Sequence, residues 1–202
     1  MDEGARASLA RLDEITRRLR VECPWDREQD ERSIVPHTVE EAYELADAAN
    51  AGDDDKMVDE LGDVLFQVLF LSLLLEERGA GDLAAVAERM REKLIRRHPH
   101  VFGEVEVAGA AEVVHNWDAI KRGESGSLFG DLPENLPAML YARKVQRRAA
   151  NAGVTPAAPD VAGSFGDIGR RLFELVGEAR QLDVDPELAL RAYARQFKEG
   201  AE

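Results

Sequence analysis

The sequence contains a single cysteine, Cys23, and no apolar stretch long enough to cross a membrane. One thiol cannot form an internal disulfide, so the fold must be stabilised by its core. The longest apolar run, residues 64–75, is interrupted by Gln67 and falls short of the roughly twenty residues that a spanning helix needs. The first residues, Met1 to Arg6, form no apolar signal segment. We therefore expect a cytoplasmic protein without a membrane anchor.

Positive charge is also scarce, because 26 Lys and Arg residues face 40 Asp and Glu residues, which gives a net charge of −14. This balance argues against a protein that binds polymeric nucleic acid, where affinity depends on neutralising phosphates. The basic residues gather between positions 89 and 98, namely Arg89, Arg91, Lys93, Arg96, Arg97 and His98. Such a cluster suits a small phosphorylated ligand. The alternative is a basic helix end that interacts with its own dipole.

Apolar residues recur every three or four positions, which predicts an all-α fold. The first helix ends before Pro24, and the next carries Glu40 to the turn near Gly52, with Ser33 or Thr38 as its cap and Pro36 in its first turn. Further helices are expected over residues 54–78, from Asp82 to just before Pro99, and around residues 116–121. The first 125 or so residues would form one helical bundle.

Two acidic pairs flank the predicted turn. Glu41 and Glu44 are three residues apart, as are Glu60 and Asp63, so each pair lies on one face of its helix. Glu44 and Glu60 are each eight residues from Gly52, and Glu41 and Asp63 are each eleven. In an antiparallel hairpin, every acid would therefore face another acid.

Four converging carboxylates repel one another unless a cation lies between them. Because the run from Leu61 to Leu75 is apolar apart from Gly62, Asp63, Gln67 and Ser72, we expect this helix to be buried on most sides and Asp63 to need a partner. Oxygen ligands without His or Cys favour Mg²⁺, with Mn²⁺ as a possible substitute. The alternative interpretation is that each pair belongs to an ordinary solvated acidic face.

The pattern Glu40-Glu41-x-x-Glu44 followed by Glu60-x-x-Asp63 resembles that of the MazG nucleoside triphosphate pyrophosphohydrolases. The likeness runs from about residue 9 to 122. It also includes Cys23-Pro24-Trp25-Asp26, the stretch from Lys93 to Phe102, and Asn116-Trp117-Asp118-Ala119-Ile120-Lys121. Together these motifs are far more specific than any one alone.

The resemblance implies the all-α NTP pyrophosphatase fold and Mg²⁺-dependent hydrolysis of nucleoside triphosphates to the monophosphate and pyrophosphate, in housecleaning or nucleotide-pool control. It implies metal ligands at Glu41, Glu44, Glu60 and Asp63. Glu40 would accept a proton from water or only orient a neighbour. Lys93 would stabilise the departing pyrophosphate and, with Arg96, Arg97, Trp117 and Lys121, bind the substrate.

Several residues keep two interpretations. Trp25 either stacks on a nucleobase or fills the core between helices, and Trp117 either stacks beside the Lys121 ammonium or simply packs. Glu112-Val113-Val114-His115 has the Glu-x-x-His spacing of di-iron bundles, but that architecture needs the motif twice. We therefore expect the histidines to be surface or supporting groups.

The C-terminal part resembles a truncated, degenerate second copy of the first. Residues 60–66 align with residues 167–173, and residues 82–94 align with residues 185–197. Arg170 replaces Asp63, Gln196 replaces Lys93, and no paired glutamates follow residue 131, so we expect residues 131–202 to pack without chemistry of their own. The expected domains are a catalytic domain over 1–125, a linker with one helix over 126–160, and the repeat over 161–202.

The functional hypothesis has two rivals. One is a nucleotide-sensing or partner-binding module with little turnover. The other is a related all-α pyrophosphohydrolase restricted to dUTP, dCTP or a phosphoribosyl nucleotide. We expect a homodimer or larger homo-oligomer, because the helix after Leu61 carries more apolar surface than one small bundle can cover.

Overall fold

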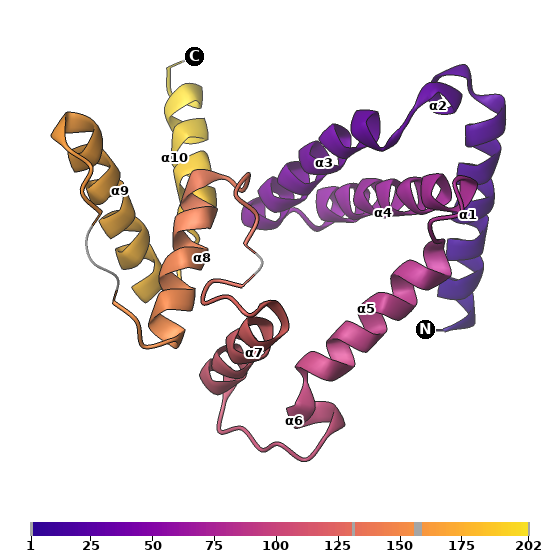
Figure 1. Ribbon diagram of the computed structural model, residues 1–202. Coiled ribbons are helices and arrows are strands. Elements are labelled where there is room, and N and C mark those ends of the chain that lie inside the picture. Colours follow the sequence, from indigo (N-terminus) through magenta and orange to yellow (C-terminus); the bar gives the residue numbers. More distant parts are fainter. Residues whose placement is uncertain (1, 131, 156–158, 202) are drawn as a thin grey trace. The chain divides into compact units, whose positions relative to one another are not determined.

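The computed structural model describes residues 2–130, 132–155 and 159–201, which hold ten α-helices and no strand (Figure 1). The helices are α1 (Glu3–Glu22), α2 (Pro24–Glu28), α3 (Glu31–Ala51), α4 (Asp54–Glu77), α5 (Leu83–Arg97), α6 (Pro99–Phe102), α7 (Ala110–Ser125), α8 (Ala138–Asn151), α9 (Gly163–Gln181) and α10 (Pro186–Glu199). The all-α prediction is confirmed.

The chain divides into two compact units, Met1–Lys93 and Leu94–Glu202. This division does not follow the domain boundaries predicted near residues 125 and 160. The predicted domains and the C-terminal repeat remain predictions. The two units are defined by which residues contact one another, and such contacts do not show whether one segment is a copy of another.

The α3–α4 hairpin forms the centre of the first unit, and its ends are set by local capping. Gly52 adopts the left-handed conformation at φ 69° and ends α3, where a residue with a side chain would be strained. The Asp53 carboxylate then accepts a hydrogen bond from the Lys56 amide at 3.0 Å and starts α4. The two helices therefore turn back on each other at Gly52, as the sequence predicts.

The predicted start of α3 was wrong. Asp30 is the cap, and it forms a capping box in which the Ser33 amide donates to the Asp30 carboxylate at 2.9 Å. Ser33 is thus the reciprocal partner, and the Thr38 hydroxyl donates within the helix to the Ile34 carbonyl. Pro36 consequently lies inside the helix, beyond its first turn.

The core of the first unit forms where the second half of α4 meets other helices. Ile34, Phe70 and Leu74 are buried together, with Phe66 and Leu71 packed against them. Arg20 of α1 lies 5.8 Å from the Phe70 ring centre and pairs with Glu77 at 2.8 Å. Hydrogen bonds from the same guanidinium to the Asp26 and Gln29 carbonyls connect α1 to the segment before α3.

The expectation that α4 is buried on most sides was wrong for its first half. Leu61, Gly62 and Asp63 are exposed, whereas Leu69, Phe70, Leu73 and Leu74 of the second half are buried. The reason is that α3 covers one face of the first half. Ion pairs of Glu76 with Arg17 and of Glu77 with Arg20 show that α1 reaches the end of α4.

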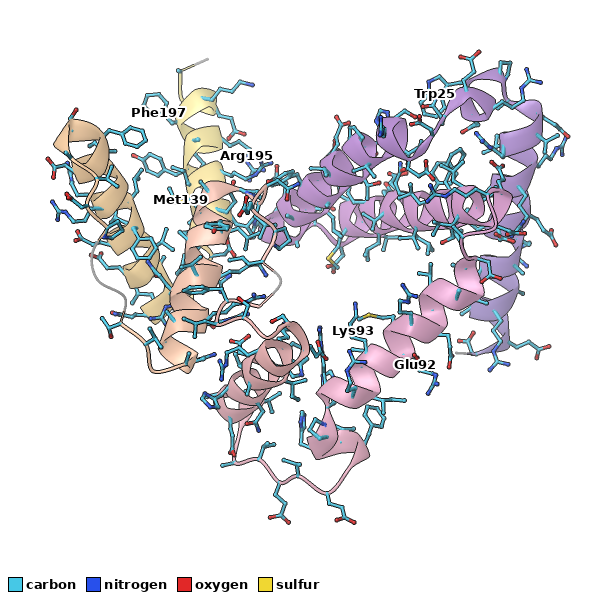
Figure 2. The ribbon with its side chains drawn as sticks, in the orientation of Figure 1. Trp25, Glu92, Lys93, Met139, Arg195 and Phe197 are labelled. Carbon is cyan, nitrogen blue, oxygen red and sulfur yellow. The ribbon has the colours of Figure 1, made fainter. Side chains whose placement is uncertain are left out.

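Charge pairs connect the helices of the second unit. Glu124 of α7 accepts hydrogen bonds from Arg96 at 2.8 Å and from Arg97 at 2.5 Å. Arg143 of α8 pairs with Asp185, the cap of α10, at 2.6 Å. Val176 is the buried apolar residue of α9, but Tyr193 and Phe197 of α10 are 72% and 73% exposed (Figure 2 labels Phe197). Large apolar side chains of α9 and α10 are therefore exposed in the part of the second unit that the structure describes.

Phe70→Ala should lower the free energy of unfolding by about 3–5 kcal/mol, because it removes a fully buried ring and leaves a cavity. Urea denaturation followed by circular dichroism would measure this loss. Val21→Ala, at an exposed apolar position of α1, should change the free energy by less than about 0.5 kcal/mol. Equal effects of both variants would contradict the assignment of this core.

Glu124→Gln should reduce stability at neutral pH but not at strongly acidic pH. Hydrogen bonds from Arg97 and then Arg96 lower the pKa of Glu124 from the usual 4.5 to about 2. A carboxyl with a lowered pKa in the folded state stabilises the fold above pH 4.5 and loses that contribution as the pH falls toward 2. Because the pair is partly solvated, we expect a difference of about 1 kcal/mol at pH 7.

Urea midpoints measured from pH 7 to pH 3 should show the two curves converging below pH 4.5. Glu104→Gln, an exposed carboxylate of the same unit, is the matched control and should match the parent at every pH. A Glu124→Gln difference that is independent of pH would show that the ion pair is not its cause.

Candidate active site

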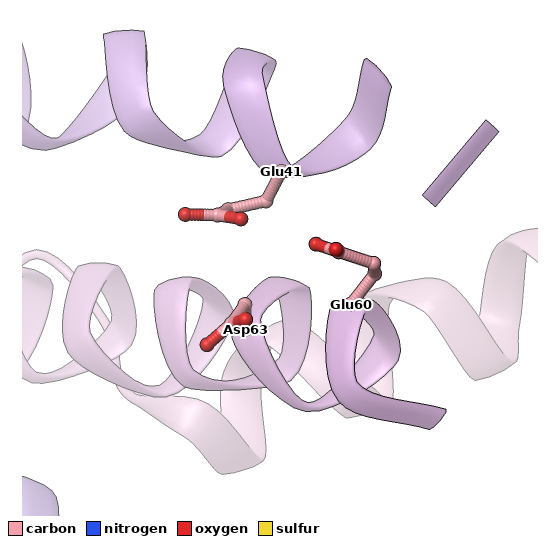
Figure 3. Close-up of side chains that lie close together, drawn as sticks. All are labelled: Glu41, Glu60 and Asp63. Carbon is pink, nitrogen blue, oxygen red and sulfur yellow. The ribbon is translucent and has the colours of Figure 1, made fainter. Parts of the chain in front are cut away.

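Three carboxylates meet across the α3–α4 hairpin (Figure 3). Oxygens of Glu41 on α3 and of Glu60 and Asp63 on α4 all lie within 4.8 Å of one another. Glu60 is 6% exposed, Glu41 is half-buried and Asp63 is exposed. The equal spacing from Gly52 thus brings acids of both helices to one place.

Burial and mutual repulsion make the charged forms of these groups unfavourable. Burial, and then the nearby charges of Asp63, Glu44 and Glu60, raise the pKa of Glu41. Burial and Glu44 likewise raise the pKa of Glu60, while the Lys56 ammonium, 3.7 Å away, opposes the rise. A divalent cation would relieve the repulsion of all these groups at once.

Glu44 and Glu40 lie at the margin of this group. Glu44 is exposed. After burial, its charge is the largest cause of the raised pKa of Glu60, so Glu44 lies near the cluster without being one of the three converging acids. Glu40 is exposed and lies 3.7 Å from the His37 imidazole. The expectation of a buried Asp63 was wrong, because the first half of α4 is solvated and Glu60 is the buried acid.

The predicted phosphate-binding residues lie along α5. Lys93 is half-buried and is the last residue of the first unit (Figure 2). Arg96 and Arg97 belong to the second unit, where both contact Glu124. Sequence reasoning missed Glu124, although its position three residues after Lys121, one helical turn away, was a usable signal.

A cavity of about 300 Å³ at Asp82, Arg89 and Glu92 includes none of the predicted site residues.

Trp117 and Lys121 form a cation–aromatic pair on α7. The Lys121 ammonium lies 5.3 Å from the Trp117 ring centre, and the His98 ring meets the same indole edge-on at 4.9 Å. Trp117 is therefore partly packed and also next to a charge. Trp25 is 53% exposed and meets the His37 ring at 6.0 Å, so the core interpretation of Trp25 was wrong.

Among the residues that the structure describes, Glu41, Glu60 and Asp63 are the only group of His, Cys, Asp or Glu with metal-binding geometry. A histidine site involving His115 is thus not found there. The search for membrane-spanning helices over the same residues found no candidate.

Residues 29–102 match the MazG nucleotide pyrophosphohydrolase domain family. A protein of Thermotoga maritima named nucleoside triphosphate pyrophosphohydrolase/pyrophosphatase MazG is 37% identical, with 88% of this chain and 76% of the relative covered. The nucleoside triphosphate pyrophosphohydrolase of Escherichia coli K12 is 40% identical over 81% of this chain, which spans 63% of that relative's length. An uncharacterized 26.1 kDa protein of Streptomyces cacaoi is 37% identical, covering 96% of this chain and 81% of the relative.

The matched range contains both helices that carry the converging acids and the basic residues of α5, and the similarity to the relatives extends well beyond it. These matches and the hairpin geometry lead to one assignment: the chain belongs to the MazG family.

Proposed function

We propose that the protein hydrolyses nucleoside triphosphates to the nucleoside monophosphate and pyrophosphate, and that Glu41, Glu44, Glu60 and Asp63 hold the Mg²⁺ that this reaction requires. The observation that carries the proposal is the convergence of Glu41, Glu60 and Asp63 within 4.8 Å. The T. maritima and E. coli relatives are both named nucleoside triphosphate pyrophosphohydrolases. A role in nucleotide-pool control or housecleaning is part of this proposal.

The residues fit Mg²⁺ by their chemistry. The donors are all carboxylate oxygens, which Mg²⁺ and Mn²⁺ prefer, and no His or Cys belongs to the group. Exposure of Asp63 leaves room for the waters that Mg²⁺ normally retains. When bound, the metal would act as a Lewis acid toward a phosphoryl oxygen and would also lower the pKa of a bound water, so that hydroxide is available at neutral pH.

The protein's own side chains would supply charge and proton acceptance. Lys93, Arg96 and Arg97 would bind the phosphates and stabilise the charge that develops on pyrophosphate. Glu40, exposed beside His37, would accept the proton of the attacking water or orient a neighbouring acid. Trp117 and Lys121 would contact the nucleotide through stacking and charge.

The test of the proposal is a screen of the eight common nucleoside triphosphates with Mg²⁺, Mn²⁺ or EDTA, in which pyrophosphate and orthophosphate are measured separately. We expect pyrophosphate release with either metal and none with EDTA. Turnover of dUTP or dCTP alone would favour the restricted enzyme. Nucleotide binding without turnover would favour the sensing module and contradict the proposal.

Asp63→Asn should lower Mg²⁺ affinity and turnover by more than roughly 100-fold, because even groups that only support a metal ligand contribute about 10- to 100-fold. The substitution removes one charge with little change of shape, so the circular dichroism spectrum should stay helical. Asp59→Asn, an exposed acid of the same helix outside the converging group, should retain parental turnover. Activity of Asp63→Asn within a few-fold of the parent would exclude Asp63 from the site.

We also propose homo-oligomerisation through the exposed apolar faces of α9 and α10, because contiguous uncovered apolar surface is typical of an interface. Sedimentation at micromolar concentration should show no dominant 22.3 kDa species. The double variant Tyr193→Ser/Phe197→Ser should dissociate the assembly. If Leu61→Ser dissociates the assembly instead, the interface lies on α4, as the sequence analysis predicted. A monomeric parent would rule out an interface on α4 and on α9 and α10.

A further inference from the structure

Among the described residues, the basic side chains that gather on α7 and α8 outnumber the acidic side chains near them. The two helices pack together within the second unit. The cations are Lys121 of α7 and Lys144, Arg147 and Arg148 of α8. In a chain whose net charge is −14, a local excess of positive charge is unexpected.

Among the described residues, the carboxylate that lies with these cations is already engaged. Asp118 is 2% exposed and accepts hydrogen bonds from Arg147 at 3.3 Å and from Asn151 at 2.6 Å. Asp118 therefore neutralises Arg147. Lys121, Lys144 and Arg148 keep their charge without an ion pair among the described residues.

Arg148 shows the imbalance most clearly. It is 8% exposed, and its Nε and Nη1 atoms donate no hydrogen bond within the part of the chain that the structure describes. Its Nη1 lies close to Gly130, where an added Cβ atom would come within 3.0 Å of it. A guanidinium stays protonated at any ordinary pH, so this side chain cannot relieve its burial by losing charge. A buried, unpaired charge is unfavourable unless a ligand completes it.

The two lysines experience the same crowding. Burial lowers the pKa of Lys121, Asp118 opposes this effect, and the guanidinium groups of Arg97, Arg147 and Arg148 lower it further. Burial is also the main cause of the lowered pKa of Lys144, followed by Arg147, Arg148 and Arg143. Arg97 and Arg143 have their own partners in Glu124 and Asp185, so the excess charge belongs to Lys121, Lys144 and Arg148.

We propose that Lys144 and Arg148, together with Lys121 from the nucleotide-contacting residues of the proposed function, form a binding site for an anion with at least two phosphoryl groups. This inference rests on that proposed function. The planar guanidinium of Arg148 matches two phosphate oxygens, and the ammonium groups add charge from α7 and α8. A single carboxylate from a second copy of the chain would neutralise only one of the three cations. The site lies partly within residues 131–202, which the sequence alone led us to regard as inert packing.

Titration calorimetry with inorganic pyrophosphate, on the full chain in low salt and EDTA, tests the site without turnover. We expect the parent to bind and Arg148→Met and Lys144→Met each to weaken binding by about 10-fold or more, as expected for loss of a charged hydrogen bond. Arg171→Met, at an exposed arginine of α9, is the matched control and should bind like the parent. No binding by the parent, or unchanged binding by Arg148→Met, would overturn the proposal.

Thermal melting separates a ligand site from a protein partner of Arg148. Without pyrophosphate, Arg148→Met should melt at or above the parental temperature, because the variant lacks an uncompensated buried charge. Pyrophosphate should raise the melting temperature of the parent and not that of the variant. A variant that melts lower than the parent in the absence of anion would show that Arg148 has a protein partner, and the proposal would be wrong.

Two further arms identify the source of the phosphates and separate a failure of this anion site from a failure of the proposed hydrolysis. Tighter binding of adenosine triphosphate than of inorganic triphosphate, dependent on Arg148, would assign the site to nucleotides, and equal binding would assign it to the free anion. Asp63→Asn should bind pyrophosphate like the parent in EDTA. Loss of hydrolysis and loss of the anion site can therefore be observed separately.

Discussion

Repulsion among carboxylates shapes the first unit, because α3 and α4 bring Glu41, Glu60 and Asp63 within 4.8 Å of one another. Such an arrangement costs stability, and the hairpin tolerates it because other contacts fix the two helices independently. The turn at Gly52, the cap at Asp53 and the core around Phe70 all lie outside the acidic group. The fold thus holds the acids in place, and a bound cation would offset the repulsion that results.

Arg20 shows how that support is built away from the acids. Its guanidinium contacts Glu77, the Phe70 ring and two carbonyls of the segment before α3. One side chain thereby joins α1, α4 and the start of the hairpin. These contacts lie away from the first half of α4, where Leu61, Gly62 and Asp63 are exposed to solvent.

The second unit shows the opposite imbalance. Its cations on α7 and α8 outnumber the one buried acid near them, whereas Arg96 and Arg97 are matched by Glu124. Among the described residues, the acids of the first unit and the cations of the second unit are thus only partly compensated. The acidic group of the first unit is suited to a divalent cation, and the basic group of the second unit is suited to phosphates.

The sequence by itself determined the all-α class, the turn at Gly52 and the facing of Glu41 with Asp63, because these depend on local propensity and on counting residues from a turn. The order and spacing of its motifs, Glu40-Glu41-x-x-Glu44 and then Glu60-x-x-Asp63, also indicated the MazG family. Only the tertiary structure decided which acid is buried, since burial depends on how the faces of α3 and α4 pack together. The partner of Arg96 and Arg97 and the burial of Arg148 likewise depend on contacts between residues far apart in the chain, which no local pattern encodes.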